Sequence, residues 1–374
     1  SQNTLLKIRN TNSVNAHQEP LYVINLIPIN KNQLNLINNS DIESISVLKD
    51  AASAAAYGAR ASNGVVVITT KSGSSRETGY IEVDVKSGVN FQAIPRYNVI
   101  TSPEEYIGYV WEGLYNRGRL DPTISDTAVN YANLSLFGEG GSGYGTGAGV
   151  GYNMWNVSPA TGGLIDPATR TVRPGVDRLF TPERYADLGI GNGMRTESNL
   201  RMGGGSENSK YFVSIGYLND EGYIINSDYK RYSTRLNLTS DIKDWLTVGA
   251  NMGYSFSQST NNGQIAGSEN ISEQADKMAP IYPVFARYPN TGELILDPVF
   301  GGAQYDYGSP TGTTTPDPTR AFTRSRPNAN LLNPIGSAVL DSDGRDTHAL
   351  NGNLSAKFKL TDDLTFETKF GGQY

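Results

Sequence analysis

Cysteine is absent from this chain of 374 residues, and so are long hydrophobic runs and clusters of basic residues. Without cysteine there is neither a disulfide framework nor a thiolate metal site. No run of 18 or more apolar residues occurs, which excludes a transmembrane helix. The net charge of −6 comes from scattered charges, so the basic stripe that binds phosphate backbones is missing. We therefore expect no nucleic-acid partner.

Hydrophobic residues are also scarce, at 37%, whereas glycine (41 residues) and tyrosine (22 residues) are abundant. Soluble globular chains usually contain roughly 45–50% apolar residues. A low apolar content argues against helical membrane proteins only. The strands of a membrane β-barrel place every second residue on a polar interior, and this lowers their apolar content.

Alternation of apolar and polar residues with a period of 2 dominates the chain from residue 80 onward. Successive side chains of a strand point to opposite faces, so each such segment has one apolar and one polar face. The alternation predicts seven strands, the second of them weaker than the others: Tyr80–Phe91, Thr196–Gly204, Tyr211–Tyr217, Tyr232–Thr239, Leu246–Phe256, Leu350–Leu360 and Leu364–Tyr374.

The connections between these strands differ in length. Short turns are predicted at residues 202–210, 241–244 and 361–363, and long connections at residues 92–195, 218–230 and 257–346. Bacterial outer-membrane barrels have short turns on one side and long loops on the other. The pattern therefore favours a barrel wall, although a soluble antiparallel sheet with one solvated face has the same alternation.

The long connections have features of their own. Ser102-Pro103-Glu104-Glu105 is a capping box with proline at the first helical position, and it predicts an amphipathic helix over Pro103–Arg117. This helix is not basic, so packing onto the rest of its loop is favoured over binding a membrane surface. Loop aromatics are candidates either for substrate binding or for anchoring the loops to one another: Trp155, Tyr282, Tyr305 and Tyr307, with Phe285 and Tyr288.

Asp41–Gly73 has a different pattern, in which a strand, a short alanine-rich helix, a glycine turn and a second strand follow within about thirty residues. This order predicts a compact βαβ-like unit ahead of the long strands. The sequence contains no constellation typical of an active site. Its two histidines, His17 and His348, lack companions at metal-ligand spacing. We expect no enzyme activity, no cofactor and no bound metal.

Three runs of residues resemble the plug domain of the SusC/RagA family of TonB-linked outer-membrane transporters. They are IESISVLKD at residues 42–50, AAAYGARASNG at residues 54–64 and VVVITTK at residues 65–71. The residues that carry the resemblance are Leu48, Lys49, Asp50, Tyr57, Gly58, Arg60, Asn63 and Gly64. The family usually has Asp-Gly where this chain has Asn25-Leu26, and a leucine disfavours a turn with positive φ.

The resemblance implies a mainly β protein with a small α+β plug over residues 1–78 and a partial antiparallel transmembrane β-barrel over residues 79–374. It also implies TonB-dependent import of an oligosaccharide or peptide across the outer membrane of a Gram-negative cell, with the plug gating the lumen. The partners would be the TonB–ExbB–ExbD complex, a SusD-like surface lipoprotein and outer-membrane lipid. Lumen-facing candidates for contact with the plug are Glu82, Asp84, Lys86 and Arg235.

Seven strands do not close a barrel, and open sheet edges are not viable in lipid. We therefore expect this chain to be a fragment that begins inside the plug. Two alternatives remain open: a passive porin or adhesin, which has no use for the Asp41–Gly73 unit, and a soluble glycan-binding β-domain.

Overall fold

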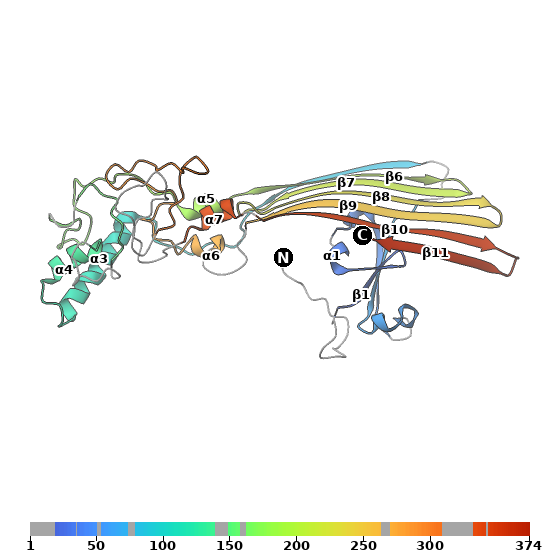
Figure 1. Ribbon diagram of the computed structural model, residues 1–374, viewed down its shortest axis with the longest axis horizontal. Helices are drawn as coiled ribbons and strands as arrows, with labels where there is room; N and C mark the ends of the chain where they lie inside the picture. Colours follow the sequence, from blue (N-terminus) through green and yellow to red (C-terminus); the bar gives the residue numbers. More distant parts are fainter. Residues whose placement is uncertain are drawn as a thin grey trace.

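The computed structural model describes residues 19–34, 36–50, 54–73, 79–138, 149–157, 162–262, 270–308, 332–341 and 343–374. These residues form two sheets and a body of helices and loops (Figure 1). The seven-stranded sheet, here called the wall sheet, is long and curved. The four-stranded sheet, here called the plug sheet, lies against one face of the wall sheet, and the helices of the long connections gather at one end of it.

The plug sheet contains β1 (Leu21–Ile24), β2 (Ile27–Ile29), β3 (Ile42–Leu48) and β4 (Val65–Thr70) in the order β2-β1-β4-β3. A short helix α1 (Lys31–Leu34) and a 3₁₀ turn η1 (Asn39–Asp41) connect β2 to β3. Strand β1 is buried along its whole length because it lies between β2 and β4. Its apolar side chains supply the centre of both small cores of this sheet.

The predicted βαβ-like unit is wrong in its geometry. Strands β3 and β4 pair antiparallel, and the parallel partner of β4 is β1. Two 3₁₀ turns, η2 (Ala55–Tyr57) and η3 (Ala59–Ala61), stand where the alanine-rich helix was expected. Gly58, with φ +69°, separates these turns and prevents one continuous helix. The parallel partner could not be recognised within Asp41–Gly73 because it lies upstream.

The turn between β1 and β2 forms despite Leu26. Asn25 and Leu26 both have positive φ, +45° and +74°, as a two-residue hairpin turn requires. Leucine is strained in this conformation, and its side chain is 57% exposed, so it gains little from packing. The turn forms although leucine disfavours it, because pairing of β1 with both β2 and β4 outweighs the local strain.

The wall sheet confirms the seven predicted strands, in the order β11-β10-β9-β8-β7-β6-β5, with every neighbouring pair antiparallel. The strands are β5 (Tyr80–Asn90), β6 (Gly193–Gly205), β7 (Ser209–Glu221), β8 (Asp228–Lys243), β9 (Leu246–Asn261), β10 (Asp343–Lys359) and β11 (Thr365–Gln373). Most run longer than predicted. The connection from β7 to β8 is therefore only residues 222–227, not a long loop.

The two faces of the wall sheet differ in polarity, as the alternation predicted. On the face away from the plug sheet, Val83 is 68% exposed and Ile215 is 54% exposed. On the facing side, Phe212, Ser214 and Asn237 are buried. One face of the wall is thus apolar and uncovered, and the other is mostly polar and covers the plug sheet.

Two rows of neighbouring rings, some stacked and some tilted, cross the apolar face. Tyr217, Tyr232, Phe256 and His348 form one row near the long connections, with successive ring centroids 5.2, 6.3 and 4.7 Å apart. Trp245, Phe358 and Phe366 form the other row near the short turns, at 6.3 and 6.2 Å. His348 and Phe358 lie on the same strand. Ten residues of strand at a tilt of about 40° span roughly 26 Å, close to the height of about 25 Å of the apolar band of outer-membrane barrels.

The long connections fold into one body, here called the loop body. It contains α3 (Pro103–Leu120), α4 (Ala128–Leu136), α5 (Tyr185–Gly189), α6 (Ile271–Gln274) and α7 (Pro334–Leu340). The predicted helix is confirmed: Ser102 Oγ accepts a hydrogen bond from the Glu105 N–H. Ile107, Trp111 and Leu114 of α3 enter a large apolar core shared by both long connections, so the helix packs onto its own loop. Among the described residues, no helix is both long and apolar enough to span a membrane.

Ion pairs and hydrogen bonds also tie the two long connections together. Arg96 pairs with Asp276, and Arg287 with Glu183. The Tyr282 hydroxyl donates to the Val150 carbonyl oxygen across 3.0 Å. The loop body is therefore a single packed unit rather than two independent loops.

Candidate functional site: the interface between plug and wall

The plug sheet contacts the wall mainly through polar side chains. The Asn38 amide, on the connection before β3, donates to Asn199 Oδ1 of β6 at 2.7 Å. The Asn237 amide of β8 donates to the Thr70 hydroxyl at 3.1 Å. The Arg231 guanidinium of β8 donates to the Ile37 carbonyl oxygen at 3.2 Å. Because the strand alternation directs these polar residues inward, they meet the plug without an apolar core between the two sheets.

One buried ion pair joins the two sheets on this side. Asp41 Oδ2 and Arg235 Nε are 3.6 Å apart, and both side chains are at least 95% buried. This distance is too long for a hydrogen bond, and Asp41 Oδ1 and Arg235 Nε have no hydrogen-bond partner among the described residues. Burial raises the pKa of the Asp41 carboxyl group, although the Ser214 hydroxyl and the Arg235 guanidinium act in the opposite direction.

Strands β9 to β11 contact the plug through fewer groups. The Asn353 amide donates to the Asn25 carbonyl oxygen at 3.1 Å, and the Asn25 amide approaches Asn251 Oδ1 at 3.4 Å. The Ile27 side chain covers Gly371 of β11, where a Cβ would lie 2.7 Å from Ile27 Cδ1. All of these contacts come from the β1–β2 hairpin of the plug sheet.

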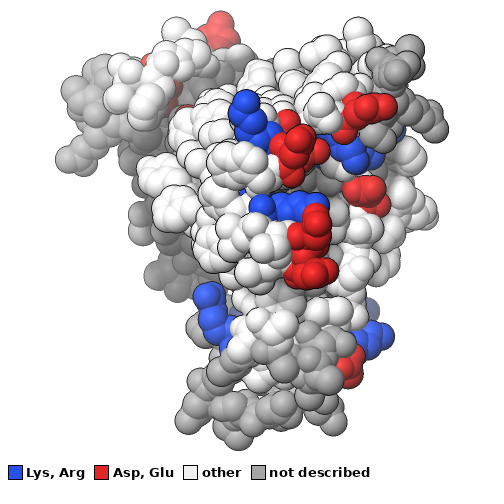
Figure 2. All heavy atoms as spheres, turned by 90° about the vertical axis from the view of Figure 1, so that its right-hand side faces the viewer, with Lys and Arg blue, Asp and Glu red and all other residues white. Residues whose placement is uncertain are grey.

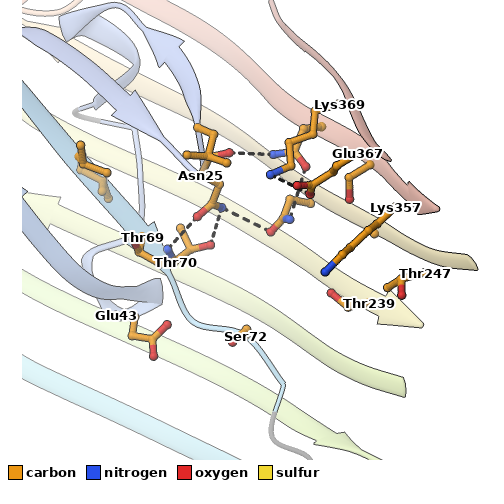
Figure 3. A pocket seen from close by; sticks show the side chains of 17 residues that line it. Asn25, Glu43, Thr69, Thr70, Ser72, Thr239, Thr247, Lys357, Glu367 and Lys369 are labelled. Atoms are coloured by element: carbon orange, nitrogen blue, oxygen red, sulfur yellow. Dashed lines mark hydrogen bonds and ion pairs between the residues drawn. The ribbon is translucent and has the colours of Figure 1, made fainter. Parts of the chain in front are cut away.

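A cleft of about 480 Å³ separates β4 of the plug sheet from β8–β11 of the wall (Figure 3). Nine of the 17 residues that line it carry a hydroxyl or amide group, four are charged, and the rest are apolar or glycine. Glu367 and Lys369 pair at 3.0 Å on β11, and Lys357 and Glu43 approach the cleft from opposite sheets. Two acidic and two basic residues leave the lining with no net charge. Charges of both signs also lie next to one another at the short-turn end of the molecule (Figure 2).

Of the four predicted lumen contacts, Arg235 is the one that reaches the described part of the plug. Glu82 and Asp84 pair instead with Arg201 of the adjacent strand, at 2.8 and 3.7 Å, and Lys86 lies 3.4 Å from Asp84. For these three, contact with the plug stays a prediction; among the described residues, the charges of β5, at the edge of the wall sheet, are matched within the wall. Four further contact residues were not predicted, because their only signal in the sequence is asparagine at an inward-facing position: Asn199, Asn237, Asn251 and Asn353.

The residues of the plug resemblance have separate structural roles. Gly58 and Gly64 adopt φ of +69° and +95°, which L-residues rarely adopt, and Leu48 and Tyr57 pack against the core around Val65. Lys49, Asp50, Arg60 and Asn63 lie on the connection around these turns, away from the contacts to the wall described above. Their role as family markers stays a prediction.

The candidate loop aromatics lie inside the loop body. Trp155 and Tyr282 are each only 2% exposed and belong to its core. Tyr305 is half-buried, with its ring 5.3 Å from that of Phe285, and Tyr307 is half-buried as well. Burial of Trp155 and Tyr282 matches the alternative that these residues anchor the loops. Substrate contact by Tyr305 and Tyr307 stays a prediction.

Residues 1–65 match the family model of the TonB-dependent Receptor Plug Domain. A TonB-dependent receptor of Formosa agariphila is 28% identical over 79% of this chain, and the TonB-dependent receptor SusC of Bacteroides thetaiotaomicron is 27% identical over 99% of it. The chain is similar to TonB-dependent receptors of the SusC type. A solved structure of the RagAB peptide transporter has the same fold, with a TM-score of 0.61 and 22% identity over 98% of this chain.

This SusC/RagA-like chain spans only a fraction of each relative: 24% of the Formosa receptor, 31% of SusC and 36% of the RagAB transporter chain. Strands β1, β2 and β3 lie within the residues that match the plug model, and the seven-stranded sheet shares its fold with the RagAB transporter. Both edges of the wall sheet, β5 and β11, are open in this chain.

Proposed function

We propose that this chain belongs to a transporter that imports an oligosaccharide or peptide across the Gram-negative outer membrane, with residues 1–78 as the plug and 79–374 as barrel wall. One observation carries the proposal: the plug sheet is held against the wall by polar groups. Each neutral hydrogen bond contributes only about 0.5–1.5 kcal/mol net, because water can replace the partner. A force on the plug can therefore exchange these contacts for water, which a shared apolar core would resist.

The apolar face of the wall supports an outer-membrane location. Aliphatic side chains are exposed between the two rows of rings, and the roughly 26 Å between the rows agrees with a bilayer's apolar band. In water, such a continuous apolar surface would cause association. A soluble glycan-binding domain accounts for neither feature.

Two protein partners follow from the family. The TonB–ExbB–ExbD complex would supply the force on the plug from the short-turn side, and a SusD-like surface lipoprotein would cover the long-connection side. The loop body offers that lipoprotein a packed surface at the opposite end of the wall from the short turns (Figure 1). We propose transport by plug displacement, with no bond chemistry at this interface.

The test uses the full-length transporter in cells with and without TonB. The probes are a fluorescent pool of neutral oligosaccharides and a fluorescent peptide digest. We expect uptake of one probe that stops when TonB is deleted or the proton gradient is collapsed. Uptake that continues without TonB would favour a passive porin, and purification of the protein without detergent would favour a soluble domain.

A further inference from the structure

The apolar face of the wall sheet contains a groove of about 380 Å³ on β9–β11. Its floor is formed by Gly352 of β10 and Gly372 of β11, which pair directly. The same cross-strand row carries side chains on β7, β8 and β9, where it runs through Val213, Leu236 and Met252. The row therefore loses its side chains at β10 and β11, and the groove is continuous with the rest of the apolar face.

Apolar side chains flank this floor on both sides. Leu350 and Tyr374 stand on the side of the long connections, and Leu354 and Phe370 on the side of the short turns. Among the described residues that line the groove, none is charged, and the Asn353 amide points to the opposite face, where it contacts the plug. The backbone groups of β10 and β11 are already paired with one another. A polar ligand would therefore find few partners here, whereas an apolar ligand would contact side chains on both flanks.

The groove lies close to the middle of the apolar band. On β10, Gly352 comes four residues after His348 of one ring row and six residues before Phe358 of the other. At a strand tilt of about 40°, four residues correspond to about 10 Å. The groove is thus slightly nearer to the long connections, which lie outside the cell in outer-membrane barrels. Its depth matches the acyl chains of outer-leaflet lipids rather than their headgroups.

We propose that this groove binds one acyl chain of an outer-leaflet membrane lipid. The inference rests on the outer-membrane location under the proposed function and adds a lipid site to it. Apolar surface alone does not favour the groove, because lipid chains are as apolar as leucine and no hydrophobic driving force acts between them. Packing decides instead. A chain in the groove contacts the floor and both flanks, so it gains more dispersion contacts than a chain on the flat part of the face.

The floor is open to such a chain. A Cβ at Gly372 would meet no atom within 4 Å beyond its own chain neighbours, so the surrounding side chains do not close over this position. In a longer wall, a strand beside β11 would add a further flank rather than a cover, because the side chains of a sheet stand roughly perpendicular to it. A second copy of this chain is the competing occupant, and the experiments separate the two.

The test uses the full-length transporter in nanodiscs of phosphatidylethanolamine. A fraction of this lipid carries a photoreactive diazirine near the end of one acyl chain, and mass spectrometry locates the adducts after irradiation. Gly372→Leu fills the floor at a position with free space. Ala356→Leu is the matched control, because it places a leucine on the same face of β10 but outside the groove.

We expect at least fivefold more adducts at residues 350–354 and 370–374 than at residues 211–215 and 234–238, which belong to the same cross-strand row of the same face. Gly372→Leu should lower the adducts in the groove at least fivefold, and Ala356→Leu less than twofold. Leucine suits a strand better than glycine, so we expect Gly372→Leu to fold. Equal labelling of the two regions in the unmodified transporter overturns the site without any variant, and so does an unchanged adduct level in Gly372→Leu.

Single cysteines distinguish a lipid from a second copy. Gly372→Cys is oxidised in cell membranes with copper phenanthroline, and Ala356→Cys measures random collisions between transporters. We expect disulfide-linked dimers of Gly372→Cys to be no more than twofold above those of Ala356→Cys. A larger excess would assign the groove to a second copy and overturn the lipid site. If the full-length protein dissolves without detergent, the outer-membrane location itself fails, and this outcome is distinct from the others.

Discussion

Replacing Arg235 tests whether the buried ion pair fixes the plug. With both groups charged, 3.6 Å corresponds to an attraction of about 4–5 kcal/mol at an effective dielectric constant of about 20. Burying the two ions costs several kcal/mol each, so the pair contributes little net stability. Arg235→Met nevertheless leaves Asp41 buried without its cation. We expect it to weaken plug docking by about 3 kcal/mol, the lower end of the range for a broken buried pair, because no hydrogen bond is lost.

The double variant separates the pair from its surroundings. Asp41→Leu with Arg235→Met removes both charges, and we expect docking within about 1 kcal/mol of the unmodified protein. Hydrogen exchange of the β4 amides in the full-length transporter measures docking, since these amides exchange when the plug separates and opens. If the losses of docking free energy caused by Asp41→Leu and by Arg235→Met simply add in the double variant, the two residues are not coupled.

The raised pKa of Asp41 gives the same interface a pH dependence. A carboxyl group whose pKa is higher when docked binds more protons in that state, so docking weakens as pH rises. The contribution is fully present below the usual pKa of about 3.9 and is lost as pH rises through the raised value. The positive charges of Arg235, Arg201 and Lys71 lower the pKa of Asp41. They therefore reduce its rise and narrow the pH range over which docking weakens. Asp41→Asn should remove this pH dependence of β4 exchange, and an unchanged profile would contradict the assignment.

Three further predictions concern the turn between β1 and β2, the loop body and the wall. Leu26→Gly should stabilise the plug by about 0.5–1 kcal/mol in thermal unfolding, because relief of strain at φ +74° exceeds the entropic cost of glycine. Leu136→Ala should cost the loop body about 2–5 kcal/mol, measured by resistance to proteolysis, whereas Leu120→Ala, at a position 71% exposed, should be near neutral. Single cysteines in the full-length protein should be labelled from the lipid phase at Val83, Val85, Val248 and Phe358 and not at Asp84, Gly249 and Lys357; the reverse pattern would contradict the wall assignment.

The strands could be predicted because their signal is local. Side-chain direction alternates along each strand, so the faces carrying Val83 and Asp84 follow from the chain alone. The same is true of the α3 start at Ser102, which depends only on the next three residues. The predicted ends of the strands were less accurate. Polar residues at the ends of β7 and β8 belong to the strands because they pair with residues of the neighbouring strand.

The plug–wall contacts could not be predicted because they join residues far apart in the sequence. Asn38 and Asn199 are 161 positions apart, and neither has a distinctive neighbourhood. Arg235 was predicted to face inward and contact the plug, but its partner Asp41, in η1, could not be named because it lies 194 positions away. The parallel pairing of β1 with β4 was missed for the same reason, since neither strand contains information about which edge its partner takes.

The distribution of apolar and polar contacts is compatible with the proposed movement of the plug. The loop body and the plug sheet each have apolar cores of their own, such as those around Trp111 and Ile68, and burial makes each a stable unit. Between plug and wall, asparagine recurs instead, and its amide can donate to and accept from either protein or water. Replacing an inward asparagine such as Asn237 by leucine should therefore strengthen docking only if the Lys71 carbonyl oxygen finds water; the Thr70 hydroxyl keeps the hydrogen bond that it accepts from the Asn25 amide at 2.7 Å. A polar seam between two apolar cores confines movement to the seam, and this is the physical condition for a plug that moves without unfolding.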